Sequence, residues 1–425
     1  MVTYLISAFI FGYLLISLEE VIKINKTAVA LYTGVISWVV YVLNSGHAED
    51  FSEELTMQLG DISEILFFLM GAMTIIELID IHRGFDVITN RINTTSKKKL
   101  LWMIAGISFF LSALLDNLTA SIVIISLLRK LIDDKEDMKL FAGVLIIAAN
   151  AGGAWSPIGD ITTTMLWIGG QISATSIMKT LFIPSVISLL VPMIYFSFTI
   201  KGELHRVENE EEDTKKTEKV RGSKQMLIGG LGALIFVPIF KSITHLPPYM
   251  GMLLGLSVVW ILSELIHFNK DEQEKKPFSA VHALSKIDAP SVLFFLGILL
   301  AVGALEHAHI LYGLAIWMNA TIGNLDFIVF FMGIMSSIVD NVPLVAATMG
   351  MYSLSDFPMD SRLWEFTAYC AGTGGSILII GSAAGVAVMG MAKVSFGWYL
   401  KRITFAAILG YLAGALYFML VNAWL

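Results

Sequence analysis

The chain has 425 residues, of which 56% are hydrophobic and only 15% charged, and its mean hydropathy is +0.75. These values exclude an ordinary soluble globular protein, in which about a quarter of the residues are charged. The formal net charge of −7 says little about partners, because the placement of Lys and Arg beside apolar segments sets the orientation of a membrane protein.

Apolar segments recur along the whole chain, each of roughly 17–25 residues, which is the length that a helix needs to cross a hydrocarbon core of about 30 Å. We therefore predict an all-α polytopic membrane protein without a separate soluble domain. No basic residue precedes the first segment and no small-residue cleavage site follows it, so we expect a retained helix and not a removed signal peptide. The predicted spans are residues 3–18, 27–43, 62–80, 140–168, 177–200, 226–242, 249–268, 289–305, 363–393 and 403–424.

Two further apolar segments, residues 100–129 and 326–353, are too long for one helix, and each carries an Asp-Asn pair near its middle. A re-entrant hairpin, which enters and leaves the membrane on one side, fits such a segment better. Basic residues flank the first hairpin and acidic residues flank the second, so the positive-inside rule places the first pair of ends in the cytoplasm and the second pair outside. Under this scheme both chain termini lie outside, and every Lys and Arg except Lys179, Lys241 and Arg362 is cytoplasmic.

Two polar connections fit the same scheme. Residues 44–61 form an acidic loop that we expect outside, and residues 201–224 form a mixed-charge linker that we expect in the cytoplasm. The linker contains an acidic run at residues 208–213, which is typical of a solvated segment.

The two halves of the chain share their order of motifs. The segment SALLDNLTAS at residues 112–121 is matched by SSIVDNVPLVA at 336–346, and a Gly-rich segment follows each at nearly the same distance. In the predicted topology, corresponding helices of the two halves cross the membrane in opposite directions. The sequence therefore predicts two inverted repeats, an architecture of secondary transporters. The predicted organisation is an N-terminal extra helix at 1–26, a first repeat at 27–200, a cytoplasmic linker and connecting helix at 201–248, and a second repeat at 249–425.

The tip of the first predicted hairpin carries Asp116 in the middle of the membrane, where a carboxylate on a helix costs roughly 2.5–3.5 kcal/mol. Asn117 and Thr119 can cap the half-helices there, while Asp116 offers oxygen to a cation. Asp340 and Asn341 occupy the corresponding place in the second hairpin. The alternative is that each aspartate only caps a helix inside the protein.

The segment GGAWSPIGD at residues 152–160 cannot remain a regular helix, because its proline removes a hydrogen-bond donor and its glycines weaken the helix. A break exposes carbonyl groups that can coordinate a small cation, and Asp160, Thr162 and Thr163 follow with further oxygens. The matching segment at 372–385 offers hydroxyls but no carboxylate. The alternative is a kink whose polar residues only satisfy freed backbone groups. Further candidate ligands for a transported cation are Asn150, Thr373, Ser376 and Ser382.

Glu77 and Glu306 close corresponding helices of the two halves, and His307 follows Glu306. These side chains could relay protons or sense pH. The alternative is that they only mark the membrane boundary, as charged residues at helix ends often do.

The motifs LLDNLT, GGAWSPIGDITTTMLW and IVDNVP make nearly the whole chain resemble the NhaD-type sodium/proton antiporters of the ion transporter superfamily. The resemblance implies two inverted units, each with a re-entrant hairpin and a broken transmembrane helix. It also implies that Asp116, Asp160, Thr162 and Thr163 bind the transported cation. Related dicarboxylate symporters carry serine where this chain carries aspartate in each hairpin, and these charges would repel an anion.

We therefore expect a secondary transporter that exchanges cytoplasmic Na+ or Li+ for external H+ by alternating access at a mid-membrane carboxylate site. Its expected partners are monovalent cations, protons and the lipid bilayer of a bacterial inner membrane, without a cofactor or nucleic acid, and we expect a homodimer. The alternatives are an anion permease or sodium-coupled carboxylate symporter of the same superfamily, a passive channel, and an intramembrane aspartyl protease that would use Asp116 and Asp160. The absence of an ATP-binding motif from the sequence favours secondary transport.

Overall fold

The computed structural model describes residues 1–17, 19–45, 51–89, 94–200, 202–203, 220–338 and 340–421. Within these ranges the regular elements are helices, and no strand is formed. The first part of the chain contains α1 (Val2–Ser17), α2 (Glu19–Ile22), α3 (Lys26–Ser45), α4 (Phe51–Ile81), α5 (Asp86–Thr89), α6 (Lys97–Leu115), α7 (Asn117–Leu131), α8 (Lys135–Gly153), α9 (Ile161–Ile168), α10 (Ala174–Thr199) and α11 (Ser223–Thr244). The rest contains α12 (Pro248–Ile266), α13 (Glu272–Lys275), the 3-10 helix η1 (Lys276–Phe278), α14 (Ala280–Leu284), α15 (Ala289–His307), α16 (Ile310–Ile322), α17 (Leu325–Met335), α18 (Asn341–Met351), α19 (Arg362–Gly374), α20 (Ala383–Ala392), α21 (Phe396–Arg402) and α22 (Thr404–Val421).

Among the described residues, 8 helices are long and apolar enough to cross a membrane: α3, α4, α6, α10, α11, α12, α15 and α22. The count rises to 10 if each of two bent pairs is one span, and these pairs are α16 with α17, bent by 115°, and α20 with α21, bent by 108°. An apolar helical protein of this kind is a multi-pass membrane protein.

The helices are interrupted at the places that the sequence predicts. Helix α6 ends and α7 begins at Asp116, and α8 and α9 are separated by residues 154–160. In the other half, α19 and α20 are separated by residues 375–382. The Gly-rich and Pro-containing segments therefore break their helices, as local backbone chemistry requires.

Other boundaries differ from the prediction. The predicted external loop at residues 44–61 is partly helical, because α4 begins at Phe51 and its apolar residues recur at helical spacing. Helix α16 was not predicted, since its 13 residues are too short for a span, and it is bounded by His309 and Gly323, both with positive φ. The acidic run at 208–213 lies outside the described residues.

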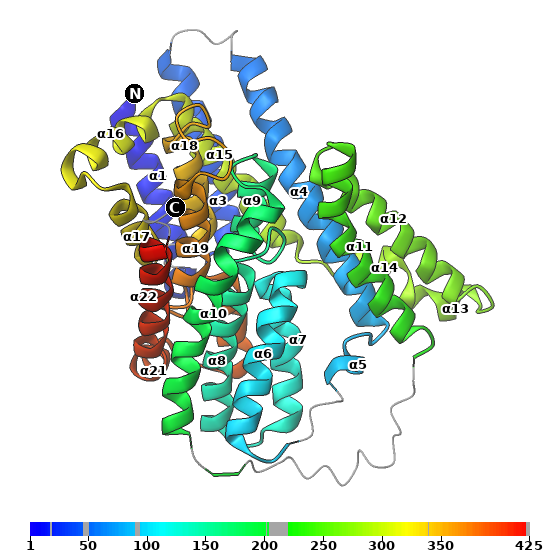
Figure 1. The fold of residues 1–425 in the computed structure, drawn as a ribbon. Helices are drawn as coiled ribbons and strands as arrows, with labels where there is room; N and C mark the ends of the chain where they lie inside the picture. The colour runs from blue at the N-terminus through cyan, green and yellow to red at the C-terminus, as the bar shows by residue number, and fades with distance from the viewer. Residues whose placement is uncertain are drawn as a thin grey trace.

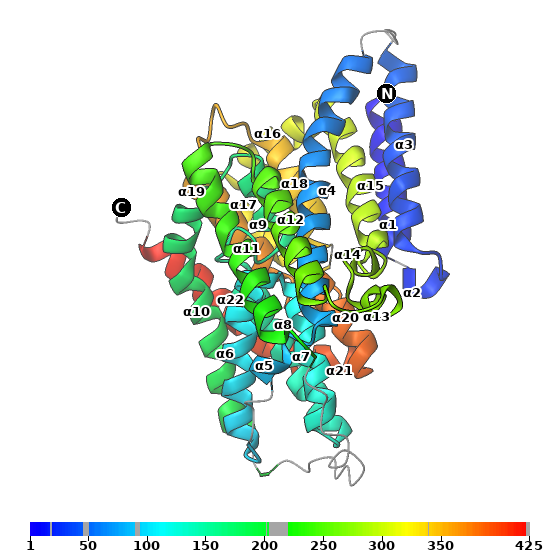
Figure 2. The ribbon, with the colours of Figure 1, turned by 90° about the vertical axis from the view of Figure 1, so that its right-hand side faces the viewer.

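The helices form two groups. We call α1, α3, α4, α11, α12 and α15 the scaffold helices, because α3 packs along α1 and α15, and α12 packs along α4 and α11. We call α6 to α10 and α17 to α22 the central helices, in which α6 packs on α8, α17 on α19, and α10 on α22. Figures 1 and 2 show α6, α7 and α8 in the lower half of the molecule and α16, α17 and α18 in the upper half.

One serine contact joins α6 to α8, and another joins the end of α17 to α19. The Ser112 hydroxyl of α6 donates to the carbonyl oxygen of Ala149 in α8 at 2.6 Å. The Ser336 hydroxyl at the end of α17 donates to the carbonyl oxygen of Ala371 in α19 at 3.0 Å. Both helix pairs are thus joined by a serine hydroxyl that donates to an alanine carbonyl.

Glycines allow these helices to approach closely. A β-carbon at Gly152 of α8 would overlap the carbonyl oxygen of Phe109 in α6. A β-carbon at Gly374 of α19 would overlap the carbonyl oxygen of Gly333 in α17 in the same way. Backbone contact of this kind is a common basis of helix packing in membranes, where water does not drive association.

An ion pair joins the outer ends of the same helices. In the first half, Lys97 of α6 contacts Asp137 of α8 at 2.6 Å. In the second half, Arg362 of α19 contacts Asp326 of α17 at 2.7 Å, and its Nε donates to the other carboxylate oxygen at 3.0 Å. The carboxylate and the basic side chain have exchanged helices between the halves.

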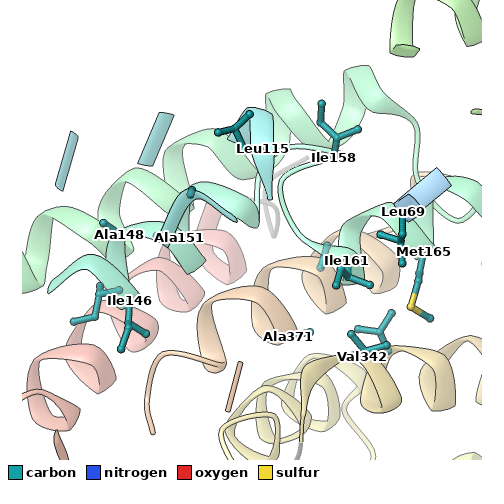
Figure 3. Close-up of a cluster of buried hydrophobic side chains, with 14 of the residues drawn as sticks. Leu69, Leu115, Ile146, Ala148, Ala151, Ile158, Ile161, Met165, Val342 and Ala371 are labelled. Carbon is teal, nitrogen blue, oxygen red and sulfur yellow. The ribbon is translucent and has the colours of Figure 1, made fainter. Parts of the chain in front are cut away.

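The buried apolar core surrounds the break between α8 and α9. Figure 3 shows Leu115 at the end of α6, Ile158 in the break, Ile161 and Met165 on α9, and Val342 on α18. Each of these five side chains is buried. The polar groups of the break are therefore held in a tightly packed apolar surrounding.

Candidate functional site

Helices α7, α9, α18 and α20 begin in the centre of the molecule, and each has a polar cap. The caps are Asp116, Asp160, Asp340 and Ser382, and each side chain accepts a hydrogen bond from a backbone N–H of the first turn. Asn117 and Thr119, which the sequence suggested as caps, do not cap the start of α7. The Asp116 carboxylate takes that role, because it directly precedes the free N–H groups of α7.

Asp160 lies at the meeting point of the central helices and is 1% exposed. One carboxylate oxygen accepts hydrogen bonds from the backbone N–H of Thr162 at 2.9 Å and from its hydroxyl at 2.8 Å. The Asn117 amide donates to the other oxygen at 2.5 Å. The Asn341 amide lies 3.4 Å from each oxygen. Because Asn117 begins α7 and Asn341 begins α18, Asp160 connects the starts of these two helices.

Asn150 extends this network to the fourth helix start. Its side-chain oxygen accepts a hydrogen bond from the Asn117 amide at 2.9 Å. Its own amide donates to the Ser382 hydroxyl at 3.0 Å. The structure thus gathers six of the predicted site residues into one buried network: Asn117, Asn150, Asp160, Thr162, Asn341 and Ser382.

The charge of Asp160 has no basic counterpart among the residues that the structure describes. A buried carboxylate without an opposite charge costs several kcal/mol, and the start of a helix contributes only about 0.3–1 kcal/mol, or up to about 2 kcal/mol in partly buried geometries. The neutral donors replace part of the lost water but leave the charge in place. A proton or a monovalent cation at this carboxylate would remove it.

Asp116 lies beside this network without a hydrogen bond to Asp160. Its carboxylate accepts from the Thr119 N–H at 2.8 Å and from the Thr119 hydroxyl at 2.9 Å. Its φ of 79° is unusual for a residue other than glycine and costs of order 1–3 kcal/mol. Asp116 also lines a small cavity of about 20 Å³ between α4, α11 and α12. It is therefore a helix cap that also faces a cavity.

The other predicted hydroxyls bond to backbone carbonyls. The Thr163 hydroxyl donates to the carbonyl of Asp160 at 2.9 Å, and that of Thr373 donates to Tyr369 at 2.6 Å. The Ser376 hydroxyl donates to the carbonyl of Thr373 at 2.7 Å. These side chains satisfy backbone groups of the breaks, and none of them contacts the Asp160 carboxylate.

Glu306 and His307 lie away from the network. Glu306 lines a cavity of about 390 Å³ between α4, α9, α15 and α18, together with Asp61 and Glu64. His307 donates from Nδ1 to the carbonyl of Gly303 at 2.9 Å.

Glu77 lies near the opposite end of α4, where Asp80 and Lys286 act on it electrostatically. It has no hydrogen bond to the Asp160 network in the described part of the chain.

One buried carboxylate was missed by the sequence analysis. Glu365 in the first turn of α19 is 6% exposed and accepts hydrogen bonds from the hydroxyls of Ser176 at 2.6 Å and Thr180 at 3.0 Å. The signal was present, because Glu365 lies just inside the predicted span 363–393, where a carboxylate is costly.

A histidine pair joins two scaffold helices just beyond their membrane segments. His82, after α4, donates from Nδ1 to the carbonyl of Leu78 at 2.7 Å, and its Nε2 lies 3.1 Å from Nε2 of His267, after α12. With His82 in that tautomer, Nε2 of His267 donates the hydrogen bond to Nε2 of His82. The buried Nδ1 of His267 has no partner among the described residues. Burial lowers the pKa of His82, and burial together with His82 and nearby Lys270 lowers the pKa of His267 to about 4.

A multi-pass helical protein whose broken helices meet at a buried, unpaired carboxylate belongs to the class of membrane transporters. The family model described as "Citrate transporter" matches residues 13–364. Sodium/proton antiporter 1 of Arabidopsis thaliana is 50% identical over 412 residues, which cover 97% of this chain and 71% of the relative. Sodium/proton antiporter 2 of the same plant is 48% identical over 414 residues, 97% of each chain. The Na(+)/H(+) antiporter NhaD of Vibrio cholerae is 31% identical over 452 residues, which cover 97% of this chain and 90% of the relative.

The chain belongs to the family of NhaD-type sodium/proton antiporters. The resemblance seen in its motifs is thereby confirmed, and the protein is a transporter and not an enzyme.

Proposed function

We propose that this protein is a secondary antiporter that exchanges cytoplasmic Na+ or Li+ for external H+ at the Asp160 network. The observation that carries the proposal is the buried Asp160 carboxylate, which neutral donors surround and no described basic side chain neutralises. The names of the relatives, sodium/proton antiporters from a plant and from bacteria, support the same pair of ions.

The chemistry of the network makes the two ions exclude each other. A proton on Asp160 removes the negative charge that would attract a metal ion, and a bound cation opposes protonation. The Asp160 carboxylate and the Thr162 hydroxyl are hard oxygen ligands, which small hard cations prefer. Asp116 lies close enough to act on Asp160 electrostatically, so we expect the two to titrate as a unit.

We further propose that the chain consists of two inverted repeats, at 27–200 and 249–425, with an extra helix at 1–26 and a connecting segment at 201–248. The recurring serine, glycine and ion-pair contacts support this division. The placement of α6 and α7 in the lower half and α17 and α18 in the upper half also supports it (Figures 1 and 2). Movement of the central helices against the scaffold helices would expose Asp160 to each side in turn.

Orientation, compartment and assembly remain predictions. The positive-inside rule supports termini on the outside, which reporter fusions can test. The bacterial NhaD relatives support the proposed bacterial inner membrane. A homodimer is also a proposal, which the mass of the purified protein in detergent tests.

Reconstitution into proteoliposomes tests the function. We expect Na+ added on one side to move H+ in the opposite direction, and Asp160→Asn to abolish this response. Liposomes that carry wild-type protein and show no cation-induced pH change, with Na+, Li+ or K+ at any pH, would contradict the proposal.

A second candidate is an anion carrier, which the description of the matching family model favours. Four helix starts meet at the site, and helix N-termini attract anions. Three of these four starts, however, already carry an aspartate cap, which would repel a carboxylate substrate. Uptake of radioactive citrate by the same proteoliposomes decides between the two, and we expect none above empty liposomes.

A further inference from the structure

A polar cavity adjoins the second tip on the side of α1. It has a volume of about 90 Å³, and the polar residues among the described ones that line it are Tyr13, Glu19, Lys26 and Asp340. Asp340 caps α18, with the N–H of Val342 at 3.5 Å, and does not contact the Asp160 carboxylate. Asp340 therefore lines this cavity, and it lies close enough to Asp160 to act on it electrostatically without a hydrogen bond to it.

The corresponding cavity at the first tip is different. It measures about 20 Å³, and only Asp116 and Thr164 contribute polar side chains to its otherwise apolar lining. Leu234 of α11 lies in that lining, whereas α1 contributes Tyr13 to the cavity at the second tip. The cavity at the second tip is thus larger, and its described lining carries more polar side chains than that of the cavity at the first tip.

The Tyr13 hydroxyl is buried and has no hydrogen-bond partner among the described residues. Leaving such a group unpaired costs roughly 1–3 kcal/mol. A cavity of about 90 Å³ exceeds the 10–15 Å³ or so that one water molecule needs, so several water molecules can bind between Tyr13 and the carboxylates. A hydrated cavity would satisfy the hydroxyl.

The one basic side chain in the lining is held elsewhere. The Lys26 ammonium lies over the Phe294 ring of α15, 4.8 Å from its centre. The backbone N–H of Lys26 donates to the Glu19 carboxylate at 3.0 Å, which keeps Glu19 at the start of α3. Glu19 is thus positioned where the cavity meets the polar connection between α2 and α3.

We propose that Asp340, Tyr13 and Glu19, with water between them, form a proton path that connects the carboxylates at the centre of the molecule with the solvent on the side of α1. This proposal rests on the proposed Na+/H+ exchange. It assigns the transfer of the proton to residues on and beside α1. A proton leaves the Asp340 carboxyl for a water molecule, and Tyr13 accepts one proton from water as it donates its own, through water, to the Glu19 carboxylate. Glu19 then releases that proton to bulk water. No group changes its redox state, and the phenol stays neutral before and after each transfer.

Two transport modes in proteoliposomes separate this role from packing. Na+/H+ exchange needs both ions, whereas exchange of radioactive Na+ for unlabelled Na+ needs no proton transfer. We expect Tyr13→Phe to slow Na+/H+ exchange about tenfold or more and to leave Na+/Na+ exchange unchanged. Glu19→Gln should act in the same direction, because Gln keeps an oxygen for the Lys26 N–H but cannot titrate. Tyr13→His should exchange Na+ for H+ faster than Tyr13→Phe, because the imidazole can also transfer a proton. Tyr4→Phe is the matched control and should behave as the wild type, since Tyr4 is 68% exposed on the same helix.

Each outcome is decisive. Normal Na+/H+ exchange in Tyr13→Phe would overturn the path, and so would an equal loss of both modes, which would assign Tyr13 to packing. A wild-type protein that shows no Na+/H+ exchange would instead overturn the proposed function.

Discussion

Replacing Asp160 by Asn should abolish cation binding while the fold persists. The change keeps the size of the side chain but removes the one buried charge that the four neutral donor groups of Asn117, Asn341 and Thr162 surround. At about 4 Å and an effective dielectric constant of about 20, that charge attracts a monovalent cation by about 4 kcal/mol. Its loss should weaken Na+ affinity about a thousandfold.

The effect on stability should be small, because two contributions oppose each other. The asparagine introduced by Asp160→Asn can keep its side-chain oxygen toward Thr162, and its amide then faces the Asn117 amide, which leaves one donor unpaired at a cost of roughly 1–3 kcal/mol. Removal of a buried, unpaired charge offsets this cost. Loss of transport would therefore reflect lost binding and not unfolding.

Thermal unfolding in detergent measures both quantities. Na+ should raise the Tm of the wild type in proportion to the logarithm of its concentration above Kd, and should not raise that of Asp160→Asn. Asp271→Asn is the matched control, because Asp271 is exposed and makes no side-chain cap. An Asp160→Asn protein that exchanges Na+ with the KM of the wild type would refute the reasoning.

Three further predictions concern competition, pH and packing. In proteoliposomes at acidic pH, the KM for Na+ should rise about tenfold for each exchanged proton and each pH unit lost, whereas a constant KM with a changing maximal rate would place the proton at a separate regulatory group. The pKa of His267 is lowered to about 4 by burial and by His82, below the ordinary value of 6.5, so the unfolded chain binds more protons between these values. The unfolding free energy should thus fall as pH drops from 6.5 to 4, by at most about 1.4 kcal/mol per pH unit, and His267→Asn should flatten the profile in thermal unfolding. Gly152→Ala should lower Tm and exchange, because overlap with Phe109 costs about 1–3 kcal/mol and exceeds the helix gain of about 1 kcal/mol, whereas Gly106→Ala, with open space around it, should not.

The sequence predicted the helix breaks because they follow from local backbone chemistry. Glycine and proline in residues 152–160 cannot maintain a helix in any surrounding, and an Asp-Asn pair inside an apolar segment needs free backbone groups to pair with. The helical start of α4 was missed, because charge alone suggested a loop, and α16 was missed because it is too short for a membrane span.

The partners within the site could not be predicted from either half alone. Asn150 contacts Ser382, and Asn341 contacts Asp160, so each pair joins residues that lie far apart in the chain. Asp116 caps α7, as the alternative interpretation of this aspartate allowed, because a cap depends on which group precedes the first free N–H. The polar cavity at the second tip requires Tyr13, which no motif marks.

The exchanged ion pairs have a consequence for how such a chain inserts. A duplicated segment that enters the membrane in the opposite sense brings the outer ends of its helices to the other surface, where basic residues would oppose insertion. Placing the carboxylate on α17 and leaving a single arginine on α19 retains the contact of the first half, which Lys97 and Asp137 make with the opposite assignment. The attraction between a carboxylate and a basic side chain is the same whichever of the two helices carries each of them. The charge at the end of each helix, which guides its orientation during insertion, is reversed. In the two inverted repeats that we propose, one exchange of partners therefore preserves the same helix contact in both orientations.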